Sequence, residues 1–127
     1  MENHPFVFDD RLDTEFLLSI YEGDAEHASL VFGQFLEMAP ALMKEMEEYY
    51  NQGVVEPFRQ KVHKLKPVFS FVGLTQLTAK AELLEKKCKE TSQINEVSDI
   101  YTDLKYNYSE NLPIIEKEVK RLNEQIN

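Results

Sequence analysis

The residue best suited to do chemistry is His63, in the stretch from Phe58 to Leu74, because polar and cationic side chains surround it at helical spacing. At about 100° per residue, Lys66 falls one turn after His63 and Gln60 one turn before it, on the same side of a helix. Histidine changes charge near neutral pH, so an exposed imidazole is partly neutral and offers a nucleophilic nitrogen. The other side chains on this face are Glu56, Arg59, Pro67 and Ser70. We therefore expect an exposed imidazole surrounded by hydrogen-bond donors and little bulk.

The helix that positions His63 has a well-defined apolar stripe. Its apolar residues fall within an arc of about 120°; they are Phe58, Val62, Leu65, Val68, Phe69 and Val72. His63 lies about 150° from the centre of this arc, so it should face water when the stripe is buried. We expect the helix to start near Pro57, a residue suited to a first helical turn, and to end at Gly73.

The same stretch resembles the signature of the histidine-containing phosphotransfer (HPt) domain, H-x-L-K-(small)-x-x-x-x-x-G. Its fixed positions are filled by His63, Leu65, Lys66 and Gly73. The helical pattern from about Leu12 to Ile126 also fits the four-helix bundle of that family. One position departs, because Pro67 stands where the family usually has glycine or another small residue.

The resemblance implies a role for each residue on this face. His63 would accept a phosphoryl group from the aspartate of a response-regulator receiver domain, or return it. Lys66 would stabilise the phosphoryl charge, and Gln60 either hydrogen-bonds the ring or phosphoryl group or is simply solvated. The protein would need no cofactor, because the receiver brings the magnesium ion. The implied partners are receiver domains, with a hybrid histidine kinase as a further candidate.

The surface around His63 is locally basic in an acidic chain. The net charge is −9, yet Phe58 to Ala81 holds five cations and no acid; the cations are Arg59, Lys61, Lys64, Lys66 and Lys80. Such a run is either a solvated helix face or a patch on which an acidic receiver site docks. The residues predicted to contact a partner are Arg59, Lys64, Pro67, Ser70 and Phe71. Phe71 lies off the apolar stripe, so core packing and docking are equally open for it.

Two functional classes compete with each other. A catalytic enzyme would need a second titratable group beside the histidine, and residues 58–81 supply none. There is also no glycine-rich phosphate loop in a chain of four glycines. We therefore predict a phosphocarrier without kinase machinery. The alternative is a pseudo-HPt adaptor that docks a receiver or helical partner without carrying phosphate; His63 and Lys66 argue against the adaptor, and Pro67 argues for it.

Composition limits the setting of the protein. A chain of 127 residues with 43% hydrophobic content predicts one domain over residues 1–127. The negative charge argues against a nucleic-acid partner, and no apolar run is long enough for a membrane span. The start of the chain lacks the pattern of a signal peptide, and the single cysteine, Cys88, excludes an internal disulfide. We expect a cytoplasmic monomer.

The predicted fold is all-α: an antiparallel up-down four-helix bundle with a short additional N-terminal helix. Residues 1–11 are expected to be either an extended lead-in whose Phe6, Val7 and Phe8 lie against the bundle or a disordered segment. Asp13 is expected to cap the short helix, which ends near Tyr21, and Asp24 and Gly53 to begin and end the next helix. The long helices are expected over about Ala25–Asn51, Pro57–Gly73, Thr75–Glu90 and Ser92–Ile126. Within them, Pro40 should kink the first helix, and Pro113 should bend or break the last.

Overall fold

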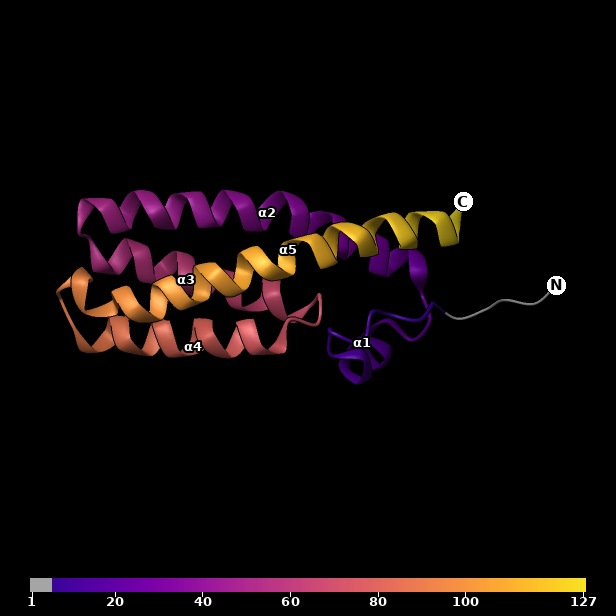
Figure 1. Cartoon of the computed structure of the whole chain (residues 1–127), viewed down its shortest axis with the longest axis horizontal. Helices are drawn as coiled ribbons and strands as arrows, with labels where there is room; N and C mark the ends of the chain where they lie inside the picture. Colours follow the sequence, from indigo (N-terminus) through magenta and orange to yellow (C-terminus); the bar gives the residue numbers. More distant parts are fainter. Residues whose placement is uncertain (1–5) are drawn as a thin grey trace.

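The computed structural model describes residues 6–127, and all regular structure in that range is helical (Figure 1). Five α-helices and one short 3-10 helix follow in order: α1 (Thr14–Tyr21), α2 (Ala25–Gln52), α3 (Val55–Ser70), α4 (Thr75–Glu90), η1 (Ile94–Val97) and α5 (Ser98–Ile126). No helix in the described part of the chain is both long and apolar enough to cross a membrane.

Helices α1 and α2 begin directly after the predicted capping residues Asp13 and Asp24, and α2 ends directly before Gly53. The Asp13 carboxylate accepts from the Phe16 amide at 3.2 Å, and the Asp24 carboxylate accepts from the His27 amide at 3.0 Å. These bonds satisfy amides that have no partner within the first turn of a helix. Gly53 closes α2 with a φ of 74°, a conformation that glycine adopts without strain.

The long helices pack in a closed set of contacts. Helix α3 lies against α2 and α4, and α5 lies against the same two helices on the other side of the core. The predicted stripe of α3 is buried at Phe58, Val62, Leu65, Phe69 and Val72, whereas Val68 is only partly buried. Burying this stripe fixes the rotation of α3 about its axis, and so decides which residues face outward.

Helices α2 and α5 are longer than α3 and α4, with 28 and 29 residues against 16 each. At about 1.5 Å per residue, they extend well beyond their shorter neighbours. Residues 6–11 and α1 pack at this extended end (Figure 1), and residues 1–5 of the expected lead-in lie outside the described residues. Phe8 is buried and stacks on Phe32 of α2 with ring centroids 5.6 Å apart, and Phe6 is buried beside it. Val7, which was also expected against the bundle, is exposed instead.

The turn between α3 and α4 requires glycine at position 73. Gly73 has a φ of 77°, and a Cβ built on it would lie 2.8 Å from Leu17 Cδ1. The Gly73 carbonyl also accepts from the Asp13 amide at 2.9 Å. Any side chain here would strain the backbone and push α1 away from the bundle.

Several predicted boundaries were wrong. Helix α3 begins two residues before Pro57 and ends at Ser70, because Phe71 to Gly73 form a separate turn. Ser92 does not cap the last helix, since the 3-10 turn η1 comes first and α5 starts at Ser98. Pro113 does not break α5, which runs uninterrupted to Ile126. Helix α2 also continues through Pro40, and the kink expected there stays a prediction.

Candidate functional site

His63 lies on the outward face of α3, and 64% of its side chain is exposed. Its nearest neighbours along the chain on the core side, Val62 and Leu65, are fully buried. The apolar stripe therefore places the imidazole in solvent, as the spacing predicted. The ring is open to an approaching molecule.

The His63 ring has an acidic neighbour, and it comes from outside residues 58–81. His63 Nδ1 lies 3.0 Å from Oε2 of Glu85, which projects from α4. Glu85 is only 4% exposed, one of two buried charged residues in the described structure. The expectation of donors alone around the histidine was wrong, because the packing of α4 on α3 brings a carboxylate to it.

Three cationic or titratable side chains of α3 converge on this one carboxylate. Lys66 Nζ lies 2.6 Å from Oε1 of Glu85, and Arg59 Nη1 lies 3.0 Å from Oε2. Burial alone would raise the pKa of Glu85, but the hydrogen bond and charge of Lys66, with the charges of His63 and Lys89, lower it below its ordinary value. Glu85 is therefore an ionised carboxylate at neutral pH.

The predicted site residues differ in how close they lie to His63 and in whether another side chain already binds them. Lys66 lies beside His63 but is engaged by Glu85. Arg59 is engaged as well, because it also pairs with Glu56 at 2.5 Å; this hydrogen bond lowers the pKa of Glu56. Gln60 is exposed, and the His63 ring is hydrogen-bonded to Glu85 rather than to Gln60.

The basic run around His63 is largely neutralised by acids from other helices. Lys61 pairs with Glu45 of α2 at 2.8 Å, and Lys80 pairs with Asp103 of α5 at 2.5 Å. With Arg59 and Lys66 on Glu85, Lys64 is the one cation of the run with no ion pair among the described residues. Counting charge along the chain overstated the positive patch, because it ignored carboxylates that packing brings in.

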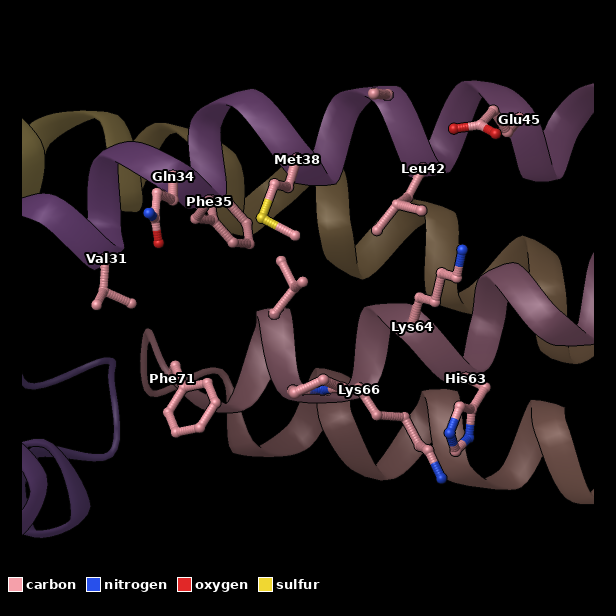
Figure 2. Close-up of a pocket in the computed structure, with 13 residues that line it drawn as sticks. Val31, Gln34, Phe35, Met38, Leu42, Glu45, His63, Lys64, Lys66 and Phe71 are labelled. Atoms are coloured by element: carbon pink, nitrogen blue, oxygen red, sulfur yellow. The ribbon is translucent and has the colours of Figure 1, made fainter.

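A groove of about 740 Å³ opens beside the histidine, between α2 and α3. Figure 2 shows His63 at one end and Phe71 at the other, with Met38 and Leu42 of α2 facing them. Phe71 is 48% exposed, so it is not ordinary core. The groove presents apolar surface directly next to an exposed titratable ring.

Pro67 and Ser70 lie between His63 and Phe71 on α3. Pro67 is exposed and lines the groove, and Ser70 is partly buried. Proline has no N–H to donate to the carbonyl four residues earlier, which is that of His63. The helix nevertheless continues through Pro67 to Ser70.

Glu85 was missed by the sequence analysis, but one signal could have found it. It lies on the same face of α4 as Ala81, Leu84 and Cys88, all of which are buried. A charged residue on a buried stripe needs a partner, because burying an unpaired charge is very costly. Searching for that partner on the neighbouring helix leads to the cations Arg59 and Lys66 and to His63 on the outward side of α3.

The family model described as "Hpt domain" matches residues 31–125, which include α3 and α4 whole. No curated protein and no solved structure matched the chain. Within residues 6–127, no cluster of three or more histidine, cysteine or acidic side chains is arranged to hold a metal ion. The match indicates involvement in two-component phosphorelay signalling, and the chain belongs to the Hpt domain family.

Proposed function

We propose that the protein carries a phosphoryl group on His63 and exchanges it with the aspartate of response-regulator receiver domains. The observation that carries the proposal is an exposed imidazole held against an ionised carboxylate and beside a lysine. A ring nitrogen attacks the phosphorus of the aspartyl phosphate, the N–P bond forms, and the bond to the aspartate oxygen breaks. The aspartate leaves as a carboxylate, and the reverse step restores it.

The proposal includes the architecture that presents His63. We infer a single domain in which α2 to α5 form an antiparallel up-down four-helix bundle and α1 is an additional N-terminal helix. Consecutive long helices run in alternating directions in Figure 1, and each of the four contacts two others around the core, which supports this arrangement.

Lys66 stabilises charge on the transferred group in this proposal. Its ammonium lies on Glu85 in the described structure, so it must turn from the carboxylate to the phosphoryl oxygens during transfer. A lysine on a flexible stem can make that change without moving the backbone. Gln60, exposed one turn before His63, is a candidate for a further hydrogen bond to the phosphoryl group. The protein uses no cofactor of its own, and the receiver supplies magnesium.

The receiver docks, in this proposal, on the face formed by Arg59, Lys64, Pro67, Ser70 and Phe71. Phe71 and Pro67 offer apolar contact along the groove, and Lys64 offers a cation without a described ion pair. A hybrid histidine kinase that carries a receiver could use the same face. We place this exchange in the cytoplasm, whose reducing conditions suit the single buried Cys88, and we expect the carrier to act as a monomer.

The test is incubation of the full chain with a panel of phosphorylated receivers, followed by lability measurements on any label. We expect a label that is lost in acid and kept in alkali, as phosphohistidine is. His63→Gln should abolish labelling, whereas the matched controls His27→Gln and His4→Gln should keep it; His4 lies outside the described residues. A label that persists in His63→Gln would overturn the assignment.

The second candidate function is an adaptor that docks a receiver without carrying phosphate. Pro67 favours it, because the ring is exposed on the groove close to His63 and adds bulk where the family usually has a small residue. The variant Pro67→Gly separates the two functions. If wild type accepts no phosphoryl group from any receiver and Pro67→Gly does, the natural protein is an adaptor.

A further inference from the structure

Helix α1 is bound at both ends to the turn between α3 and α4. Before its first residue, the Asp13 amide donates to the Gly73 carbonyl at 2.9 Å, and the Asp13 carboxylate accepts from the Thr75 hydroxyl at 2.8 Å. At its last residue, the Tyr21 hydroxyl donates to the Phe71 carbonyl at 2.6 Å. The N-terminal helix therefore holds the C-terminal end of α3.

The hydrogen bond from Tyr21 fixes a peptide group just beyond the end of α3. That helix ends at Ser70, and carbonyls at the end of a helix have no following turn to bind them. The Phe71 carbonyl obtains its partner from α1 instead. The next side chain, Val72, is fully buried in the core. With its carbonyl bound on one side and Val72 packed on the other, the backbone of Phe71 is held in one orientation.

This backbone presents the Phe71 ring on the groove beside His63. The ring is 48% exposed and lies at the end of the groove opposite the histidine (Figure 2). A side chain follows the backbone that carries it, so freeing this peptide would let the ring move out of the groove. Resting on the function proposed above, we propose that Tyr21 is a positioning residue for receiver docking, whose hydroxyl holds the Phe71 ring where the receiver contacts it.

Tyr21 is itself held by a cluster of rings. It is 4% exposed, and its ring centroid lies 5.1 Å from that of His27 and 6.3 Å from those of Phe8 and Phe32. Burial raises the pKa of Tyr21 to about 12, so the hydroxyl keeps its proton and can donate at neutral pH. The ring contacts do not depend on the hydroxyl. Tyr21→Phe should therefore remove the bond to Phe71 and keep the packing.

The first test needs no receiver. Hydrogen exchange at the amides of residues 71–74 reports how often the turn opens. We expect exchange there to be about fivefold faster in Tyr21→Phe than in wild type, a factor typical for the loss of one hydrogen bond. Exchange at residues 62–66 of α3 should be unchanged. Equal exchange at residues 71–74 in the two proteins would overturn the inference.

The second test compares Tyr21→Phe with Tyr101→Phe. Tyr101 is the matched control, because its buried ring carries a hydroxyl that donates to Glu47 at 2.7 Å, and neither residue lines the groove. Calorimetry gives the Kd for the receiver of the panel that binds wild type most tightly, and transfer at saturating receiver gives the maximal rate. Tyr21→Phe should raise the Kd by about three- to tenfold and keep the maximal rate. Tyr101→Phe should keep both.

A double substitution shows whether Tyr21 acts through Phe71. Phe71→Ala should weaken receiver binding by itself, because it removes the ring that the receiver contacts. Adding Tyr21→Phe to Phe71→Ala should then cause no further loss, since two residues that act through one contact are not additive. Losses that multiply in the double variant would mean that Tyr21 acts elsewhere, and would overturn the inference.

The outcomes separate this inference from the proposed function. Phosphoramidate, a small donor that passes its phosphoryl group to an imidazole with loss of ammonia, needs no docked protein and should label wild type and Tyr21→Phe equally. If both proteins bind the receiver with the same Kd, the inference is wrong and the carrier function stands. If wild type binds a receiver but accepts no phosphoryl group from any donor, the carrier function is wrong and the Kd still decides the role of Tyr21. Binding of no receiver by wild type would contradict both.

Discussion

Two buried glutamates lie in different parts of the bundle and do different work. Glu85 on α4 and Glu118 on α5 are the only buried charged residues in the described chain, at 4% and 0% exposure. Glu118 accepts from the Asp9 amide at 2.9 Å and pairs with Arg121, whose guanidinium also donates to the Val7 carbonyl at 2.8 Å. Glu85 accepts instead from side chains on an outward helix face.

The difference lies in the partners, not in the burial. Glu118 binds the Asp9 amide and also pairs within α5 with Arg121, which in turn donates to the Val7 carbonyl, so its charge helps to hold residues 7–9 against α5. Glu85 contacts an imidazole that is 64% exposed and able to react. A buried carboxylate therefore marks a constrained place, and only the exposure and chemistry of its partners distinguish a reactive site from a structural clamp.

The largest expected effect comes from exchanging each glutamate for glutamine in turn. Glu118→Gln should lower the free energy of unfolding by about 2–4 kcal/mol, because it removes the charge of a fully buried carboxylate and loosens residues 7–9 from α5. Glu85→Gln should lower it by only about 1–2 kcal/mol, because Arg59 and Lys66 can return to water. Transfer should show the opposite order. Urea unfolding measures the free energy of unfolding of both variants, and phosphotransfer assays measure their transfer rates. Slow transfer in a folded Glu118→Gln protein would contradict the comparison.

Pro67 and Pro113, two of the three exposed prolines inside helices, extend the comparison. Pro67→Ala should raise the free energy of unfolding by up to about 3 kcal/mol, because alanine restores a donor to the His63 carbonyl. Pro113→Ala is the matched control, since it restores a donor to the Ser109 carbonyl in α5, away from the site. Thermal melts should show a gain for both. A transfer rate changed by Pro113→Ala as much as by Pro67→Ala would mean that local geometry at His63 is not involved.

Acid should weaken the site through Glu85. Its pKa is lowered in the folded protein, so it stabilises the fold above its ordinary pKa, and this stability is lost as pH falls through the lower folded value. At the other end of the molecule, the hydrogen bonds from Arg11 lower the pKa of Asp9 in the same direction. Urea midpoints measured from neutral pH down to about pH 3 should fall less in Glu85→Gln than in wild type. Parallel curves for the two proteins would refute a stabilising charge on Glu85.

The smallest effect is expected from Lys64, the one cation of the basic run without a described ion pair. Lys64→Ala should change stability by no more than about 0.5 kcal/mol. Salt screens the attraction between exposed charges, since the Debye length falls from about 10 Å at 0.1 M to about 3 Å at 1 M. Removing the charge of Lys64 should therefore reduce the salt dependence of association with a receiver. Lys61→Ala, which removes a cation already paired with Glu45, is the control. Equal salt dependence in wild type and Lys64→Ala would exclude steering by this residue.

Local rules predicted most of the helices. Asp13, Asp24 and Gly53 act through bonds to residues within one turn, so their caps could be read directly from the chain. The start of α5 could not, because the 3-10 turn at Ile94 to Val97 has no side-chain cap that marks it. Local periodicity also gave the outward position of His63.

The missing part of the site depends on contacts between helices. Glu85 is 22 residues from His63 in the chain, and only the packing of α4 on α3 makes them neighbours. The pairing of Lys61 with Glu45 and of Lys80 with Asp103 arises in the same way. Charge counted along one helix therefore misjudged both the electrostatics of the face and the environment of the ring. The rule that could have found Glu85 also finds Glu118, which lies on a stripe with Ile115 and Leu122.

The most direct measurement is ³¹P–¹⁵N coupling in the wild-type chain, labelled with ¹⁵N-histidine and phosphorylated by a receiver. Our account predicts coupling to a ring nitrogen of His63 and to no other histidine. His63→Gln should lose the signal, and Glu118→Gln should keep it. Coupling to a different histidine, or failure of every receiver in the panel to phosphorylate the chain, would contradict the account.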